Sequence, residues 1–118
     1  MPNLRQFRVR ELLKREIGEI LRREIPVETA GLVSVHDVIL SNDLKSATVF
    51  VGILGSTEQK KHTEKLLHQL QPRIRGQLSK GVVLKYTPRL RFKVDDSVAE
   101  GDRVLRILDE IEKDLPQE

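Results

Sequence analysis

The segment from residue 66 to residue 94 limits the fold of this chain most tightly. Its last six residues alternate between basic and apolar side chains: Arg89, Leu90, Arg91, Phe92, Lys93 and Val94. Because successive side chains of a β-strand point to opposite faces, this alternation predicts a strand with one apolar and one basic face. Pro72 has no backbone N–H and its ring clashes with the preceding turn, so we expect it to end one helix and begin a short second helix. Pro88 falls within the long strand expected next, which indicates an edge strand or a bulge.

Three further helices are predicted from apolar residues at helical spacing. The clearest runs from about residue 7 to residue 25, with this stripe: Val9, Leu12, Leu13, Ile17, Ile20 and Leu21. The second begins at a cap provided by Ser56 or Thr57 and continues to about Leu70. The last begins near Asp102 and places these residues on one face: Val104, Leu105, Leu108 and Ile111.

Residues 32–40 and 45–54 are rich in Val and Ile and are predicted to pair as an antiparallel hairpin. The turn between them, residues 41–44, contains Ser, Asn and Asp, whose side chains bond nearby backbone N–H groups. The apolar residues of the first strand change parity along its length, and a bulge near His36 and Asp37 restores the phase.

The predicted order is therefore helix, strand, strand, helix, helix, strand, helix. This order is typical of an α+β domain with one three-stranded sheet and helices on one face. Because two helices separate the last two strands, the sheet is expected to be mixed. We expect a single domain over residues 1–118, with 95–118 an acidic C-terminal segment.

Charge is distributed unevenly along the chain. Residues 1–94 contain 18 Lys and Arg against 9 Asp and Glu, whereas residues 95–118 contain 3 against 9. A basic body with an acidic tail favours a nucleic acid as the partner. Clustered surface charge without any ligand remains the alternative at this point.

The composition argues against several other classes of protein. The chain has no cysteine, so disulfides and thiolate metal sites are excluded, and its apolar runs are too short for a membrane span. Its three histidines, His36, His62 and His68, are not spaced as metal ligands, and no catalytic or nucleotide-binding motif is present. We therefore predict a cytoplasmic, monomeric protein without enzymatic activity, cofactor, metal or membrane partner.

Most of the candidate RNA contacts are basic residues from the stretch between Glu64 and Asp95, which contains no acidic residue to neutralise them. They comprise Arg73, Arg75, Lys80, Lys85, Arg89, Arg91 and Lys93, together with Arg8, Arg15 and Arg22 of the first helix. The chain has one tyrosine and three phenylalanines, and two of the latter, Phe50 and Phe92, are expected in the core. Recognition of phosphates and of RNA shape is therefore favoured over a broad stacking platform.

Three stretches of the sequence resemble bacterial ribosome-binding factor A: RVRELLKREIGEILRREI, VSVHDVILSNDLKSATVFVGIL and IRGQLSKGVVLKYTPRLRFKVDDS. The resemblance extends over about residues 5–112. Its most specific parts are the S-x-D-L turn followed by A-x-V-x-V, and the P-x-L-x-F-x-x-D-x-S pattern that begins at Pro88 and ends at Ser97.

The resemblance implies a type II KH-like fold, α-β-β-α-α-β, with the C-terminal helix following it. It also implies an assembly factor that binds the small (30S) ribosomal subunit and its ribosomal RNA late in maturation, without chemistry, and that supports growth in the cold. The family's Ala-x-Gly helix kink corresponds here to Leu70, Gln71 and Pro72. The alternative function is a protein-interaction domain whose acidic C-terminal segment binds a basic partner, with RNA contact incidental.

Overall fold

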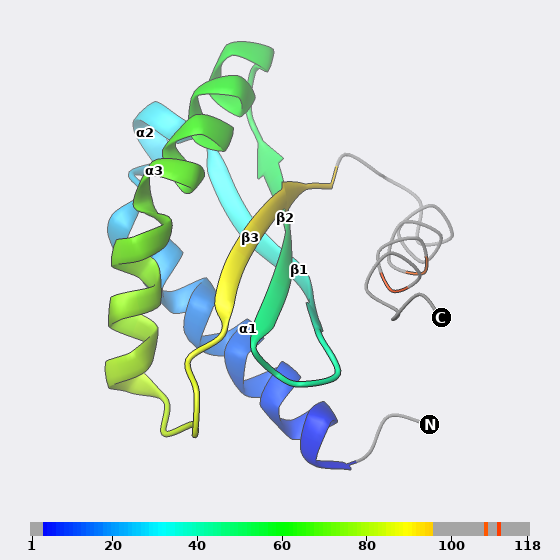
Figure 1. Ribbon diagram of the computed structural model, residues 1–118. Helices are drawn as coiled ribbons and strands as arrows, with labels where there is room; N and C mark the ends of the chain where they lie inside the picture. Colours follow the sequence, from blue (N-terminus) through cyan, green and yellow to red (C-terminus); the bar gives the residue numbers. More distant parts are fainter. Residues whose placement is uncertain (1–3, 96–107, 109–110, 112–118) are drawn as a thin grey trace.

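The computed structural model describes residues 4–95 together with Leu108 and Ile111 (Figure 1). The elements are α1 (Leu4–Glu24), α2 (Val27–Ala30), β1 (Leu32–Leu40), β2 (Ser46–Leu54), α3 (Thr57–Gly81) and β3 (Arg89–Val94). The strands form one sheet in the order β1-β2-β3, with β1 antiparallel and β3 parallel to β2. The predicted α+β fold with a mixed sheet is confirmed. The last predicted helix lies outside the described residues, except for Leu108 and Ile111, which are helical.

Helices cover one face of the sheet, with α1 packed on β1 and α3 packed on β3 and β2 (Figure 1). The buried stripe of α1 consists of Leu13, Ile17, Ile20 and Leu21. Leu12, which the sequence places on this stripe, is exposed, so the buried stripe is narrower than predicted. Pro26 ends α1 as expected and also precedes the single turn of α2, which the apolar spacing does not predict.

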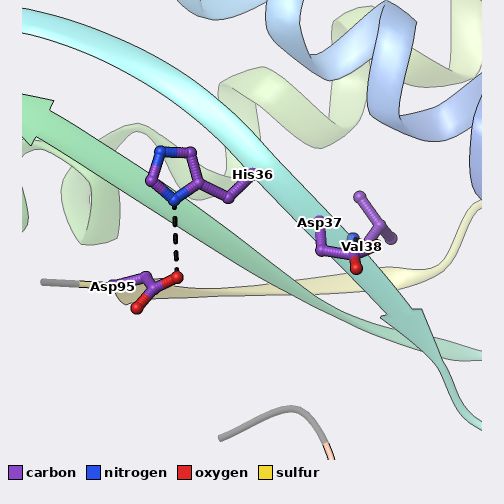
Figure 2. A network of polar contacts seen from close by, with 4 residues as sticks. All are labelled: His36, Asp37, Val38 and Asp95. Carbon is purple, nitrogen blue, oxygen red and sulfur yellow. Dashed lines mark hydrogen bonds and ion pairs between the residues drawn. The ribbon is translucent and has the colours of Figure 1, made fainter. Parts of the chain in front are cut away.

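The hairpin and its bulge are confirmed. The pairing register of β1 with β2 shifts between Val35 and Asp37, so His36 is the extra residue. Its ring fills the space above Gly52, where an added Cβ would collide with His36 Nε2. Figure 2 shows the His36 ring facing the Asp95 carboxylate. The distance from His36 Nδ1 to Asp95 Oδ2 is 3.4 Å, and the neighbouring Asp37 carboxylate accepts a hydrogen bond from the Val38 N–H at 2.8 Å.

The turn between β1 and β2 is held by its own side chains. Asp43 Oδ1 accepts hydrogen bonds from the Ser41 hydroxyl (2.7 Å) and the Lys45 N–H (3.0 Å), and Ser41 Oγ accepts one from the Ser46 N–H (3.0 Å). The Ser41 hydroxyl, then the Lys45 N–H, lower the pKa of the Asp43 carboxyl because both stabilise its ionised form. Leu44 adopts a left-handed conformation with φ of 62°, which is unfavourable for a branched side chain.

The predicted break at Pro72 is wrong. Residues 57–81 form one continuous helix, and the buried residues Thr63, Leu67, Ile74 and Leu78 keep one helical phase on both sides of the proline. Pro72 is exposed, so its ring lies on the side of α3 away from the core. The axis of α3 changes direction partway along the helix (Figure 1), and bending of this kind accommodates an interior proline. At the other end, Ser56 and Gln59 form a capping box, as the expected Ser56 cap suggested.

The last strand, β3, is also shorter than predicted. Residues 82–88 have no strand structure, and β3 begins only at Arg89, immediately after Pro88. The expected edge position is confirmed for the part of the chain that the structure describes, where β3 pairs with β2 alone. Its alternation is likewise confirmed: Leu90 and Phe92 are buried, whereas Arg89 and Arg91 are exposed. Proline therefore marks the start of the edge strand instead of interrupting it.

Replacing Pro72 by alanine should restore a backbone hydrogen bond to the carbonyl of residue 68. We expect the free energy of unfolding to rise by about 1–3 kcal/mol, measured by urea denaturation. Gln71→Ala is the matched control and should change it by less than about 0.5 kcal/mol. A loss of stability in Pro72→Ala would show instead that the packing of α3 requires the proline bend.

Candidate nucleic-acid interface

The outer surface of the helix layer contains the first set of predicted contacts. Arg8, Arg15 and Arg22 recur every seven residues, so they form one row along α1, on the side opposite its buried stripe. All three are exposed. Arg15 Nε lies 3.9 Å from the Glu19 carboxylate, a loose pair on the helix surface. Nothing in this geometry prevents the row from contacting an external anion.

The outer surface of α3 belongs to the same helix layer as this row of arginines. The two outer surfaces, of α1 and of α3, are together called the helix-layer face. The exposed residues of α3 there include three lysines, Lys61, Lys65 and Lys80, together with Glu58, His68, Gln69, Pro72, Gly76 and Ser79. A Cβ built on Gly76 would meet no atom within 4 Å, so intramolecular packing gives no reason for glycine at this position. Glycine inside a helix costs about 1 kcal/mol relative to alanine. The outer surface of α3 is therefore open at Gly76, with Pro72 and Lys80 one turn away on either side along the helix.

Arg73 is engaged within the fold. Its Nε lies 3.0 Å from Glu24 Oε2, and the Gln77 amide donates to Glu24 Oε1 at 2.6 Å. Arg23 in turn donates to Gln77 Oε1 at 3.1 Å. This network joins the end of α1 to the second half of α3, so Arg73 has a structural role in addition to any contact with a ligand.

Arg75 is also used internally. Its guanidinium donates a hydrogen bond to the Thr87 carbonyl at 2.9 Å and so fixes the segment that leads into β3. Replacing Arg73 and Arg75 together would therefore alter both the α1–α3 contact and this connection. Other residues are better suited to testing a surface contact.

The basic residues of β3 lie on the opposite face of the sheet from the helices. Leu90 and Phe92 point into the core, so the alternating Arg89, Arg91 and Lys93 point away from it. Arg91 donates to Thr48 Oγ1 on the neighbouring strand at 3.4 Å. The sequence grouped these residues with those of α1 and α3, but the fold divides them between two faces.

Lys85 lies apart from both faces, at the end of the molecule where residues 82–88 meet the β1–β2 turn. Its Nζ lies 5.5 Å from the centre of the Tyr86 ring, and the Nζ of Lys45 lies at the same distance. Lys45 was not among the predicted contacts, because it is isolated from the basic segment in the sequence. Only the sheet register brings it there, through a hydrogen bond of 2.8 Å from Arg89 N–H to the Lys45 carbonyl.

The three residues of the expected kink differ in their surroundings. Leu70 is half-buried and packs against the core, Gln71 is half-buried, and Pro72 is exposed. Any contact of this triplet with a ligand would thus be made mainly through Pro72, which adjoins Gly76 on the helix-layer face. Within residues 4–95, no three His, Asp or Glu side chains are grouped as metal ligands. No helix of this described part is long and apolar enough to cross a membrane.

The element order, the mixed sheet and the helices on one face define a KH-like α+β domain. A family model described as ribosome-binding factor A matches residues 5–108. The chain therefore belongs to the ribosome-binding factor A family, which is not a known family of enzymes.

Several solved structures share this fold. The crystal structure of ribosome-binding factor A from Thermus thermophilus is 23% identical with a TM-score of 0.66, and the match covers 75% of this chain and 93% of that one. A solution NMR structure of a Thermotoga maritima protein is 25% identical with a TM-score of 0.67, covering 85% of this chain and 96% of that one. A homology model of the Thermus protein, 22% identical with a TM-score of 0.66 and matching 75% of this chain and 93% of its own, was fitted into a cryo-electron-microscopy map of a 30S–RbfA complex.

Replacing Glu24 by alanine should weaken the contact between α1 and α3. Its side chain is only 17% exposed, and its loss removes one ion pair and one short hydrogen bond, so we expect a destabilisation of about 1–2 kcal/mol in urea denaturation. Glu19→Ala, which breaks the loose surface pair with Arg15, should cost less than about 0.5 kcal/mol. Equal effects of the two substitutions would contradict this role of Glu24.

Proposed function

We propose that this protein binds the small (30S) ribosomal subunit and assists late maturation of its ribosomal RNA by non-catalytic RNA binding. The family match over residues 5–108 carries the proposal. The 30S complex of the Thermus protein supports the choice of subunit. The proposal includes a monomeric protein that acts in the cytoplasm, needs no cofactor and supports growth in the cold.

We propose the helix-layer face as the principal RNA contact, with Lys85 and the basic face of β3 as separate contacts. A row of arginines along α1 and the exposed Lys80 of α3 present cations from one surface, and arginine forks suit phosphate oxygens. Residues on opposite faces of the sheet cannot lie against one flat segment of RNA. The two groups of cations therefore make separable contributions.

Gly76 has a specific part in this interface. The absence of a side chain between Pro72 and Lys80 lets a sugar-phosphate backbone lie close to the helix surface. Ordinary KH domains use a glycine-rich loop for this purpose. Here the glycine lies inside the helix, one turn after the proline that corresponds to the family kink.

Neutralising the helix-layer face should weaken capture by 30S subunits and flatten its salt dependence. We expect the triple variant Arg8→Gln, Arg22→Gln and Lys80→Gln to reduce the slope of log affinity against log salt by roughly 2–3, because each lost phosphate contact reduces it by about one. Co-sedimentation with purified 30S subunits across a salt series measures this slope.

The double variant Arg89→Gln and Lys93→Gln, on the other face, is the matched comparison, and circular dichroism checks that each variant folds. A larger loss in this double variant would assign the principal contact to the sheet face. Equal capture of the wild-type chain by 30S and 50S subunits would refute the proposed function. Capture that the triple variant leaves unchanged, but that is lost when residues 112–118 are deleted, would favour binding to a basic protein through the acidic C-terminal segment.

Gly76→Ala should make the protein more stable and at the same time weaken its binding to 30S subunits. Alanine finds open space at this position, so we expect the free energy of unfolding to rise by up to about 1 kcal/mol. Because the added methyl group holds the RNA backbone away, capture by 30S subunits should fall by several-fold in the same variant. A more stable variant with unchanged 30S affinity would remove Gly76 from the interface.

A further inference from the structure

One cavity of about 420 Å³ lies where the β1–β2 turn, the beginning of α1 and residues 82–88 meet. Its floor is apolar and includes Val9, Leu40 and Leu84. Its polar lining comes from Arg5, Asn42, Asp43, Lys85 and Tyr86. A cavity with an apolar floor and a few polar groups at its margin is typical of a ligand site.

Tyr86 is the distinctive residue of this cavity. It is 53% exposed, whereas Phe50 and Phe92 are each only 4% exposed and belong to the buried part of the fold. The ring lies within 5.5 Å of two ammonium groups, those of Lys45 and Lys85. Exposed aromatic rings flanked by cations are the arrangement with which proteins bind single-stranded nucleic acid, because bases stack on the ring and phosphates meet the cations.

The structure holds this site in place before any ligand binds. Leu44, which also lines the cavity, keeps an unfavourable left-handed backbone, and strain of this kind persists only where the surroundings enforce it. The Asp43 hydrogen bonds enforce it here. On the other side, the Lys45 carbonyl accepts from Arg89 N–H and the Thr87 carbonyl accepts from Arg75. Both supports of the Tyr86 segment are thus tied to β3 and α3.

Lys45 and Lys85 can move from the Tyr86 ring to phosphate groups when a base stacks on that ring. A cation–π contact at an exposed site is weaker than the stacking of a base on an aromatic ring. A base can therefore displace a lysine from the ring without a net loss. The displaced ammonium group remains beside the base, where the phosphates of a single strand would lie.

We propose that an unpaired base of single-stranded RNA stacks on Tyr86, with Lys45, Lys85 and Arg5 contacting the flanking phosphates. Asn42 offers its amide to the edge of the base, as an adaptable donor and acceptor. This inference rests on the proposed function, since it adds a base-binding site to a protein that binds ribosomal RNA. It accounts for the S-x-D-L turn, which the helix-layer face leaves without a functional role.

Tyrosine fluorescence offers a direct test, because Tyr86 is the only tyrosine of the chain and there is no tryptophan. The probes are a single-stranded RNA decamer, the same decamer with abasic sugars, and a duplex of the same length. We expect the decamer to quench the emission saturably. The abasic strand and the duplex should leave it nearly unchanged, because neither offers an unstacked base.

Variants of the ring distinguish stacking from charge. Tyr86→Leu should weaken decamer binding, measured by anisotropy of a labelled strand, by about tenfold, whereas Tyr86→Phe should retain wild-type affinity. Lys45→Gln should reduce affinity and the salt slope without preventing the quench. Leu54→Ala, at the opposite end of β2 and also exposed, is the control for removal of an apolar surface side chain and should have no effect.

Failure of this inference can be separated from failure of the proposed function. If 30S capture is selective but the decamer does not quench Tyr86 and Tyr86→Leu binds it normally, the base site is refuted and the proposed function stands. If Tyr86→Leu loses 30S capture while the decamer never quenches, the surface contacts a protein, which also refutes the base site. Equal quenching by the abasic strand would show phosphate binding only and would overturn stacking.

Discussion

The fold depends on the burial of the central strand between its two exposed end residues. Residues 47–53 of β2 are all buried, and both edges of this strand are paired, one with β1 and the other with β3. Because β3 runs parallel to β2, the chain must cross from one end of the sheet to the other between them, and α3 provides this connection. This crossover needs a long connection, and the packing of Leu67, Ile74 and Leu78 on one face keeps α3 continuous through Pro72. A break at the proline would interrupt the helix where it packs on the sheet.

The crossover from β2 to β3 also divides the basic segment among several elements. Residues 73–93 follow one another closely in the sequence, but they belong to the crossover helix, to the connection after it and to the edge strand. Arg73 neutralises Glu24, Arg75 holds the connection, and the strand residues point away from the helices. A cluster of cations in sequence is therefore no single patch in space. Some of these cations stabilise the fold through contacts within the chain, and others are exposed on the face of the sheet away from the helices.

Sequence reasoning predicted the features that depend on local chemistry: the hairpin with its bulge, the Ser56 cap, the edge position of β3 and the fold class. It failed at Pro72, because the packing of Leu67, Ile74 and Leu78 on one face outweighs the local preference of proline. It also placed the start of the last strand too early. The pairing of Tyr86 with Lys45 and the open space at Gly76 depend on contacts between distant segments, so periodicity alone could not predict them.

The buried Asp95 makes three strands depend on one another. Its carboxylate faces His36, whose ring occupies the space that the missing side chain of Gly52 leaves open, while the Asp95 N–H donates to the Val51 carbonyl at 2.7 Å. A larger residue at position 52 would expel the ring and leave the acid without this neighbour. Adding a side chain at position 52 in β2 would therefore disturb β1 through His36 and the end of β3 through Asp95.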